Sequence, residues 1–161
     1  MSIIIFTRPV HSGKTTQLLQ WCNEQKNIHG ILMPDINGSR KLLNISTKEI
    51  FEIECTNPEN TNELLTTVGK YHFYTASFDK ANLILLNALV NDPDWLIIDE
   101  AGKLELDGKG FYDAIKAAVP LYDSINRGTL LITVRDSLCE EVIDFFKVRS
   151  YRVIHQLEEL A

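Results

Sequence analysis

The sequence predicts an α/β protein in which a mostly parallel central sheet carries helices on both faces. Three observations predict this class. Short apolar runs such as residues 2–6 are typical of strands that are buried on both faces. These runs alternate with segments whose apolar residues follow a helical period, which is the order typical of parallel sheets with crossover helices. The 161 residues contain no repeat and no long linker, so we expect a single domain over residues 1–161.

The first third of the chain supplies a strand, a helix and an insertion. Residues 2–6 predict a buried strand, and residues 14–27 predict a helix. Residues 30–55 predict a small antiparallel excursion, because Asn37-Gly38 lies between two apolar runs and both residues tolerate positive φ. Residues 56–69 are polar and rich in helix and strand breakers, so we expect a loop there.

The middle of the chain predicts one further strand and helix. Residues 71–74 are aromatic and short enough for a strand. Residues 77–92 predict a helix, with Ser77 or Asp79 near its N-terminal cap and an end before Pro93.

The last third returns to the strand–helix alternation. Buried strands are expected at residues 94–102, 128–135 and 150–156. The first helix between them covers roughly residues 109–119 and is expected to stop at Pro120. The second covers residues 136–147, with Asp136 or Ser137 as its cap.

The charge balance argues against nucleic-acid binding. The chain has 16 Lys and Arg against 22 Asp and Glu, a formal net charge of −6. A protein that binds a nucleic-acid duplex needs a basic face, so we expect no nucleic-acid partner. A small anionic ligand remains compatible with the composition if positive potential is concentrated locally.

The cysteines and apolar runs indicate a cytoplasmic location. Cys22, Cys55 and Cys139 lie far apart and form no C-x-x-C pair, which argues against a zinc site or a disulfide framework. No apolar run approaches the roughly 20 residues of a membrane helix, and the N-terminus lacks the pattern of a signal peptide. We therefore expect a cytoplasmic protein without a membrane segment.

The stretch "TRPVHSGKTT" predicts a phosphate-binding loop. It follows the first strand, opens the first helix and contains the Gly13-Lys14-Thr15 half of the pattern G-x-x-x-x-G-K-[ST]. Backbone N–H groups and the helix dipole attract an anion there. We expect Lys14 to contact the β- and γ-phosphates and the Thr15 hydroxyl to ligate Mg²⁺. The expected nucleotide-binding residues are Pro9, Val10, His11, Ser12, Gly13, Lys14, Thr15 and Thr16.

Arg8 stands where the pattern has its first glycine. That glycine supplies backbone freedom at the start of the loop, whereas the later residues make most of the phosphate cradle. We therefore expect Arg8 to alter the conformation at the start of the loop rather than remove phosphate binding. Its side chain is expected either to face solvent or to contact the nucleotide.

An acidic pair at the end of another buried strand completes the expected site. In "WLIIDE", four apolar residues lead into Asp99 and Glu100, where a parallel strand would emerge next to the phosphate loop. Asp99 is expected to hold Mg²⁺. Glu100 is expected to polarise a water for in-line attack on the γ-phosphate. Lys14 and Glu100 are thus the catalytic candidates, and Thr15 and Asp99 the metal-binding candidates.

The segment "IIDEAGKLEL" resembles the I-D-E-I-G-K-M-E-L signature of the THEP1-type P-loop nucleoside-triphosphatases. The matching positions are Asp99, Glu100, Gly102, Lys103, Glu105 and Leu106, whereas Ala101 and Leu104 are substitutions. The resemblance implies a three-layer, RecA-like P-loop NTPase fold with a small antiparallel insertion. It also implies Mg²⁺-dependent hydrolysis of nucleoside triphosphates such as ATP and GTP, with broad tolerance of the base. Arg8, Val10 and His11 depart from the family's usual loop, G-P-P-G-x-G-K-T.

Two basic residues near the acidic pair are possible phosphate sensors. Lys103 either contacts a phosphate or pairs with Glu105 on the surface. Arg135 ends the strand at residues 128–135 on the same edge of the sheet. It either senses the γ-phosphate or serves as an ordinary capping or ion-pairing arginine.

Three functions are compatible with these residues. The first is a nucleoside-triphosphatase, in which Glu100 activates water. The second is a kinase of a nucleoside, nucleotide or other small molecule, which would need an acceptor pocket, built from residues 30–55 and 56–70. The third is a nucleotide-binding switch without catalysis, for which Glu100 is not required.

Overall fold

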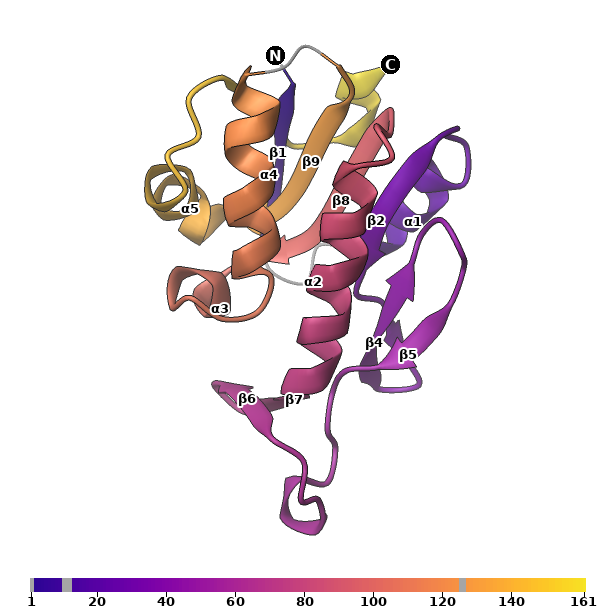
Figure 1. Ribbon diagram of the computed structural model, residues 1–161, viewed down its shortest axis with the longest axis vertical. Coiled ribbons are helices and arrows are strands. Elements are labelled where there is room, and N and C mark those ends of the chain that lie inside the picture. The colour runs from indigo at the N-terminus through magenta and orange to yellow at the C-terminus, as the bar shows by residue number, and fades with distance from the viewer. Residues whose placement is uncertain (1, 10–12, 125–126) are drawn as a thin grey trace.

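Figure 1 shows the computed structural model, which describes residues 2–9, 13–124 and 127–161. Its main sheet has eight strands in the order β10-β1-β9-β8-β2-β4-β3, and β5 pairs with β4. The strands from β10 to β2 run parallel. Their bounds are β1 (Ile3–Arg8), β2 (Ile28–Leu32), β8 (Trp95–Ala101), β9 (Thr129–Arg135) and β10 (Tyr151–Ile154). The mostly parallel sheet predicted from the sequence is confirmed.

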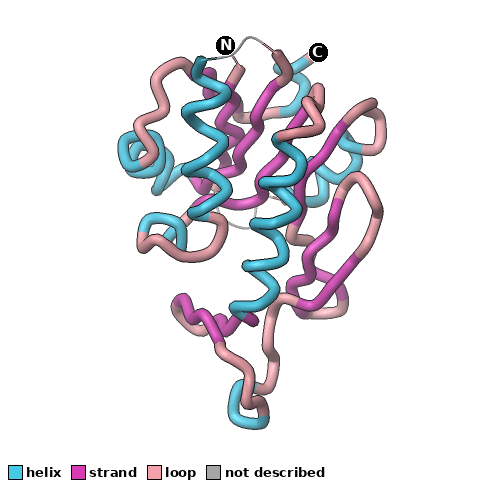
Figure 2. Tube along the Cα trace, in the orientation of Figure 1, coloured by secondary structure: helices cyan, strands magenta, loops and turns pink. Residues whose placement is uncertain are grey.

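Helices cover both faces of this sheet, because successive residues of its buried strands point to opposite faces. Ile3 and Ile5 of β1 pack in one apolar cluster, whereas Ile4 and Phe6 pack in the other. The first cluster lies under α2 (Thr75–Leu89), α4 (Tyr112–Ser124) and α5 (Cys139–Phe145). The second lies under α1 (Lys14–Cys22) and the 3₁₀ turn Leu157–Leu160. Figure 2 shows these layers along the Cα trace.

The antiparallel insertion consists of β3 (Asp35–Ile36), β4 (Ser39–Asn44) and β5 (Ile50–Glu52). Its hairpin turns at Asn37 and Gly38, whose φ values are 56° and 86°, as the sequence predicts. The predicted lower bound was wrong, however. Residues 28–32 pair in parallel with β8 as well as antiparallel with β4, so β2 belongs to the parallel sheet.

The loop predicted for residues 56–69 contains a short 3₁₀ turn (Pro58–Asn60) and a strand, β6 (Leu65–Val68). This strand pairs with β7 (Tyr71–Tyr74) through a turn at Gly69, whose φ is 56°. The polar composition of this segment predicted a loop and not a strand. The β-branched Thr and Val residues of β6 are stabilised by cross-strand pairing rather than by burial. Figure 1 shows this β6–β7 hairpin beyond the end of the sheet at which β8 terminates.

Two helices have other N-termini than predicted. α2 begins at Thr75 with Tyr74 as its cap, not at Ser77 or Asp79, because β7 leads directly into it. The Ser77 hydroxyl donates instead to the backbone carbonyl of Glu52, at 2.6 Å. The predicted 136–147 helix is a 3₁₀ turn (Asp136–Leu138) followed by α5, and Arg135 caps the turn without a side-chain hydrogen bond.

Two helices also have other C-termini than predicted. α1 ends at Cys22 rather than at residue 27, because the polar residues beyond it bury no apolar side chain against the sheet. α4 continues through Pro120 to Ser124. Proline removes one helical N–H donor, but the burial of Val119 and Tyr122 on either side of it outweighs that loss.

Among the described residues, no helix is both long enough and apolar enough to cross a membrane.

Gly30 joins β2 to β8 at a position with no room for a side chain. Its φ is 129°, and a Cβ there would lie 2.1 Å from the Ile97 carbonyl oxygen. We expect Gly30→Ala to lower the free energy of unfolding by about 2–5 kcal/mol, since backbone strain adds to the steric overlap. Urea denaturation measures the loss. Gly38→Ala is the control, because its φ is also positive but nothing lies within 4 Å of the added Cβ. A loss equal to that of Gly38→Ala would contradict the proposed packing.

Candidate functional site

The phosphate loop and the acidic strand are not neighbours in the sheet. β9 pairs with β1 on one side and with β8 on the other, so it separates the two. The acidic strand nevertheless ends next to the start of α1, as the sequence predicts. The first turn of α1 bridges the gap, because the Thr15 hydroxyl donates to Asp99 Oδ2 at 2.9 Å.

The second half of the loop has the conformation that its residues favour. Gly13 caps α1 with a φ of 80°, in the left-handed region that glycine adopts without strain. Lys14 is the first residue of α1 and is 7% exposed. Pro9 is exposed. The remaining predicted loop residues, Val10, His11 and Ser12, lie outside the described part of the chain.

Arg8 ends β1 and does not lie among the residues that line the cleft described below. Its Nη1 atom donates to Gln17 Oε1 of α1, at 2.7 Å. Arg8 therefore ties the strand to the first helix on either side of the loop.

Asp99 is a buried carboxylate, 1% exposed, at the end of β8. Its Oδ2 atom accepts hydrogen bonds from Thr15 Oγ1 and from the Met33 backbone N–H at 2.9 and 3.1 Å. Its Oδ1 atom accepts one from Thr133 Oγ1 of β9 at 2.7 Å. Asp99 thus joins three segments beneath the phosphate loop: the first turn of α1, the residue after β2, and β9.

The Thr15 hydroxyl and the Asp99 carboxylate fit a magnesium ion chemically. Both are hard oxygen donors, which Mg²⁺ prefers. Within the described chain, no three His, Cys, Asp or Glu side chains gather as a self-sufficient metal cage. Mg²⁺ in nucleotide sites needs no such cage, since it is held by one or two protein oxygens together with substrate phosphates. The donor set therefore suits a nucleotide-bound magnesium ion.

Glu100 occupies a bulge in the pairing of β8 with β9. Asp99 is opposite Thr133 and Ala101 is opposite Val134, so Glu100 has no partner in the ladder. The peptide bond before Glu100 is cis. Burial raises the pKa of the Glu100 carboxyl above its usual value, and the negative charge of Asp99 raises it further. The cations Lys14, Arg40 and Arg135 oppose that shift.

Arg135 faces Glu100 from the end of β9. Its Nε atom lies 3.9 Å from Glu100 Oε1, and the side chains are 34% and 25% exposed. The Arg135 Nε atom is buried and has no hydrogen-bond partner among the described residues. A buried donor without a partner is costly, so this group is available to an added acceptor.

These residues line a cleft of about 670 Å³. Gly13, Lys14, Thr15 and Thr16 form the wall at the start of α1, and Glu100 and Arg135 come from the ends of β8 and β9. The insertion and the β6–β7 hairpin form the opposite wall, through residues that include Asp35, Ile36, Gly38, Arg40, Lys70 and Tyr71. Four predicted loop residues therefore share one cleft with the predicted catalytic acid.

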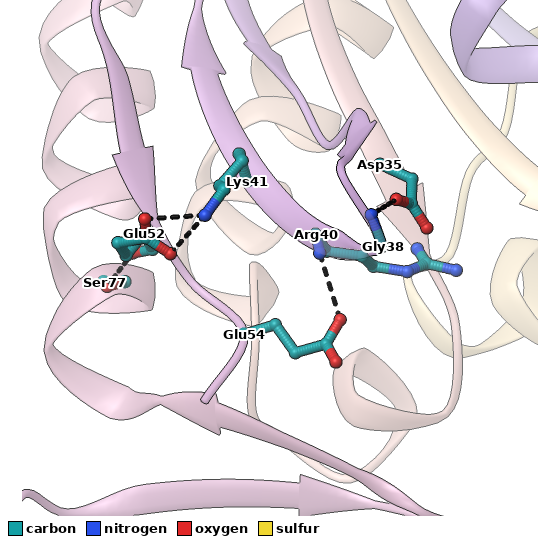
Figure 3. A network of polar contacts seen from close by, with 7 residues as sticks. All are labelled: Asp35, Gly38, Arg40, Lys41, Glu52, Glu54 and Ser77. Carbon is teal, nitrogen blue, oxygen red and sulfur yellow. Dashed lines mark hydrogen bonds and ion pairs between the residues drawn. The ribbon is translucent and has the colours of Figure 1, made fainter. Parts of the chain in front are cut away.

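Arg40 of β4 lines this cleft and was missed by the sequence analysis. Its backbone N–H donates to Glu54 Oε1 at 3.0 Å, and its guanidinium lies 5.7 Å from the Tyr71 ring centre. Figure 3 shows the Arg40 and Lys41 side chains pointing in opposite directions from β4, with Lys41 paired to Glu52. The available signal was a basic residue two positions after the Asn37-Gly38 turn. Only the folding of the insertion over the loop gives that residue a place in the cleft.

Lys103 and Glu105 do not pair on the surface, so that alternative was wrong. Lys103 is exposed on α3 (Lys103–Leu106), a short helix that was not predicted. Glu105 is only 4% exposed and accepts backbone N–H bonds from Gly102 and Phe111, both at 2.8 Å. Glu105 therefore fastens the segment between β8 and α4.

Burial raises the pKa of Glu105 to about 7 from 4.5, although its two backbone hydrogen bonds act in the opposite direction. The folded state then binds a proton more tightly than the unfolded state. We therefore expect Glu105 to stabilise the fold fully below pH 4.5 and to lose that contribution as the pH rises to about 7. We would measure the free energies of unfolding of wild type and Glu105→Gln from pH 4 to about 8. Their difference gives the contribution of Glu105 at each pH. If the difference in unfolding free energy between the two proteins stays constant over this pH range, the raised pKa of Glu105 is refuted.

The fold and the site together define a class of protein. A phosphate loop between a buried strand and a helix, with an acidic strand end beneath it, is the arrangement of P-loop nucleotide-binding proteins. The family model described as NTPase matches residues 3–159, so the chain belongs to this NTPase family. The resemblance drawn from "IIDEAGKLEL" is confirmed.

Two solved structures share the fold. The crystal structure of THEP1 from the hyperthermophile Aquifex aeolicus has a TM-score of 0.75 at 20% identity, over 100% of this chain and 97% of that chain. The solution structure of a human cancer-related nucleoside triphosphatase has a TM-score of 0.65 at 21% identity, over 96% and 88%. No curated protein sequence matches the chain.

Proposed function

We propose that this protein hydrolyses nucleoside triphosphates to the diphosphate and phosphate, with Mg²⁺ as cofactor and with little selectivity for the base. The observation that carries the proposal is the position of Glu100, which lies in one cleft with Lys14 and Thr15. Its neighbour Asp99 is 84 positions from Thr15 in the sequence and still accepts the Thr15 hydrogen bond. Membership of the NTPase family supports the same reaction class.

The start of α1 would bind the triphosphate. Lys14 and the N–H groups of the first turn supply positive charge where phosphate oxygens carry negative charge. Thr15 and Asp99 would hold Mg²⁺, and the bound ion would neutralise charge on the β- and γ-phosphate oxygens. The Thr15–Asp99 hydrogen bond fixes both side chains beside the loop, so the ligands are oriented before nucleotide binds.

Glu100 would act as the general base. Its carboxylate takes a proton from water while the water oxygen bonds to the γ-phosphorus and the bond between that phosphorus and the β–γ bridging oxygen breaks. The diphosphate leaves with the bonding electron pair. A raised pKa makes Glu100 a stronger base than an ordinary glutamate, which favours proton removal from water.

Arg135 would stabilise the charge that develops on the transferred group. Its Nε atom lies 3.9 Å from Oε1 of Glu100, the proposed general base. A guanidinium in this position donates to phosphate oxygens without needing a partner protein. Lys103 is exposed on α3 and does not line this cleft, so we assign it no part in hydrolysis.

The remaining lining of the cleft supports broad base tolerance. It includes the apolar side chains of Leu19, Leu43 and Ile50. Such side chains contact any base ring and read no pattern of donors and acceptors.

Phosphate release from ATP, GTP, CTP and UTP, with and without Mg²⁺ and without any acceptor, tests the proposal. We expect release from all four, with rates within about tenfold of one another because apolar contacts discriminate weakly. Addition of EDTA should abolish release. Tight nucleotide binding without release from any of the four would refute hydrolysis and favour the switch. Release from only one would refute the broad specificity.

A further inference from the structure

A second pocket of about 340 Å³ adjoins the nucleotide cleft. The two share a boundary formed by Met33, Arg40, Lys70, Tyr71, Glu100 and Arg135. The second pocket extends from this boundary between the β6–β7 hairpin and the segment that Glu105 fastens. Glu100 therefore faces two spaces, of which hydrolysis needs only one.

The interior of the second pocket is aromatic. Phe73, Phe78 and Phe111 line it, and their rings pack edge to face, with centres 5.7 Å apart for Phe73–Phe78 and 5.2 Å for Phe78–Phe111. These three side chains are at most 4% exposed and belong to the core of the sheet. Their ring positions are thus fixed by packing, and they form an apolar floor beside the partly exposed Tyr71 ring, which a planar ring could cover without reordering the pocket.

The lining of the pocket carries more positive than negative charge. Four cations, Arg40, Lys70, Lys103 and Arg135, line it together with Glu100 and Glu105. Both oxygens of Glu105 are already hydrogen-bonded to backbone N–H groups. The surplus of cations favours a ligand with negative charge.

In the proposed reaction, the base of the bound nucleotide does not need the second pocket. Of the six residues that the two spaces share, Glu100 and Arg135 lie at the end where the γ-phosphate would be attacked. A nucleotide whose γ-phosphate lies there has its base at the opposite end of the triphosphate chain. The second pocket is therefore free to take another molecule while nucleotide is bound.

We propose that this pocket binds a second small molecule, an aromatic compound with an anionic substituent, next to the γ-phosphate of the bound nucleotide. The ring would lie against the Tyr71 ring and the apolar floor that Phe73, Phe78 and Phe111 form, and the anionic group would face the cations at the lining. The location beside the γ-phosphate rests on the proposed function, whereas the ligand chemistry rests on the pocket alone. Because the ligand would occupy the space beside Glu100, its binding would lower the access of water and slow phosphate release.

The test uses naphthalene-2-sulfonate as the probe, measured by calorimetry with the full chain saturated with Mg²⁺ and AMP-PNP. Saturation with AMP-PNP keeps the sulfonate out of the phosphate loop. We expect submillimolar binding of the probe and at least tenfold weaker binding of 2-naphthol, which has the ring without a permanent charge, and of methanesulfonate, which has the charge without the ring. Equal binding of either control, or no binding of the probe, would overturn the proposal.

A pair of variants on one strand locates the bound probe. Val68→Phe fills the pocket from β6, and we expect it to weaken probe binding at least tenfold. Thr67→Phe adds a larger side chain at the adjacent, exposed position of β6, whose side chain points to the other face, and should leave binding unchanged. Equal affinities for the probe in the two variants would overturn the assignment to this pocket.

Phosphate release from ATP separates the failure of this proposal from the failure of the proposed function. Without the probe, Thr67→Phe should release phosphate at the wild-type rate, since Thr67 lines neither the nucleotide cleft nor the second pocket. Because Val68→Phe itself fills space beside Glu100, the effect of the probe is measured against each variant's own rate without the probe. The probe should slow release by wild type and Thr67→Phe at least threefold, and by Val68→Phe not at all. If the probe binds but does not slow phosphate release by wild type, the proposed location of the ligand beside the γ-phosphate would be overturned.

Discussion

Glu100→Gln is expected to lower phosphate release about 10²–10⁴-fold, because the amide has the size of the carboxyl group but accepts no proton from water. Nucleotide affinity should change little, since in the proposed function the loop and the first turn of α1 bind the phosphates. Single-turnover phosphate release and equilibrium binding of a fluorescent nucleotide measure the two quantities separately.

Glu54→Gln is the matched control for this variant. Glu54 lines the same cleft, but its carboxylate accepts the backbone N–H of Arg40, a role in which the amide oxygen can replace it. We expect Glu54→Gln to retain release within about threefold of wild type. A comparable loss in the two variants, or normal release by Glu100→Gln, would exclude Glu100 as the base.

The pH profile gives a second readout of the same residue. Since burial and Asp99 raise the pKa of Glu100, the acid limb of the wild-type profile should lie above pH 4.5, the ordinary value for glutamate. Glu100 acts as a base only when it is deprotonated, so the rate rises with pH through this limb. The pH profile of the residual phosphate release by Glu100→Gln should lack this acid limb.

Asp99→Ala is expected to impair both folding stability and metal-dependent binding. The substitution leaves the Met33 N–H and the Thr133 hydroxyl without their acceptor in a buried site, at a cost of about 1–3 kcal/mol for each donor. It also removes one of the two proposed magnesium ligands. We expect a loss of about 2–5 kcal/mol in urea denaturation and the loss of the Mg²⁺-dependent part of nucleotide affinity.

Two further variants separate these effects. Thr133→Val removes the donor to Asp99 Oδ1 and leaves the Thr15–Asp99 bond in place, so stability should fall by about 1–2 kcal/mol while Mg²⁺-dependent binding persists. Asp99→Asn preserves the side-chain shape, which keeps the metal prediction testable if Asp99→Ala does not fold. Retention of full Mg²⁺-dependent binding by Asp99→Asn would argue against Asp99 as a ligand.

Local sequence patterns predicted much of the fold and of the expected site. Gly13-Lys14-Thr15 between a buried strand and a helix predicts an anion site because the backbone of that turn itself supplies the donors. Asp99 and Glu100 at the end of an apolar run predict an acidic edge, because buried strands of a parallel sheet end on one side. The residues within each of these elements are close in sequence, which is why the pattern suffices.

Elements stabilised by contacts outside their own segment were the ones that sequence reasoning missed. β6 is polar and forms through pairing with β7, and α4 continues through Pro120 because its neighbours are buried against the sheet. α3 is a single turn held by Glu105, whose buried position no periodicity indicates. In each case a contact outside the segment decides a structure that the composition of the segment does not indicate.

The sequence by itself determined the residue types of the phosphate loop, the acidic pair that serves it, and the alternation that makes a parallel sheet. Only the tertiary structure decided that β9 lies between the loop strand and the acidic strand, that Arg40 enters the cleft, and that an aromatic pocket opens beside Glu100. The buried strands are mostly apolar, so their composition indicates that they are buried but does not indicate which strands are neighbours. The order of the strands follows from how the helices and the insertion pack, and it places residues that are far apart in the chain around one carboxylate.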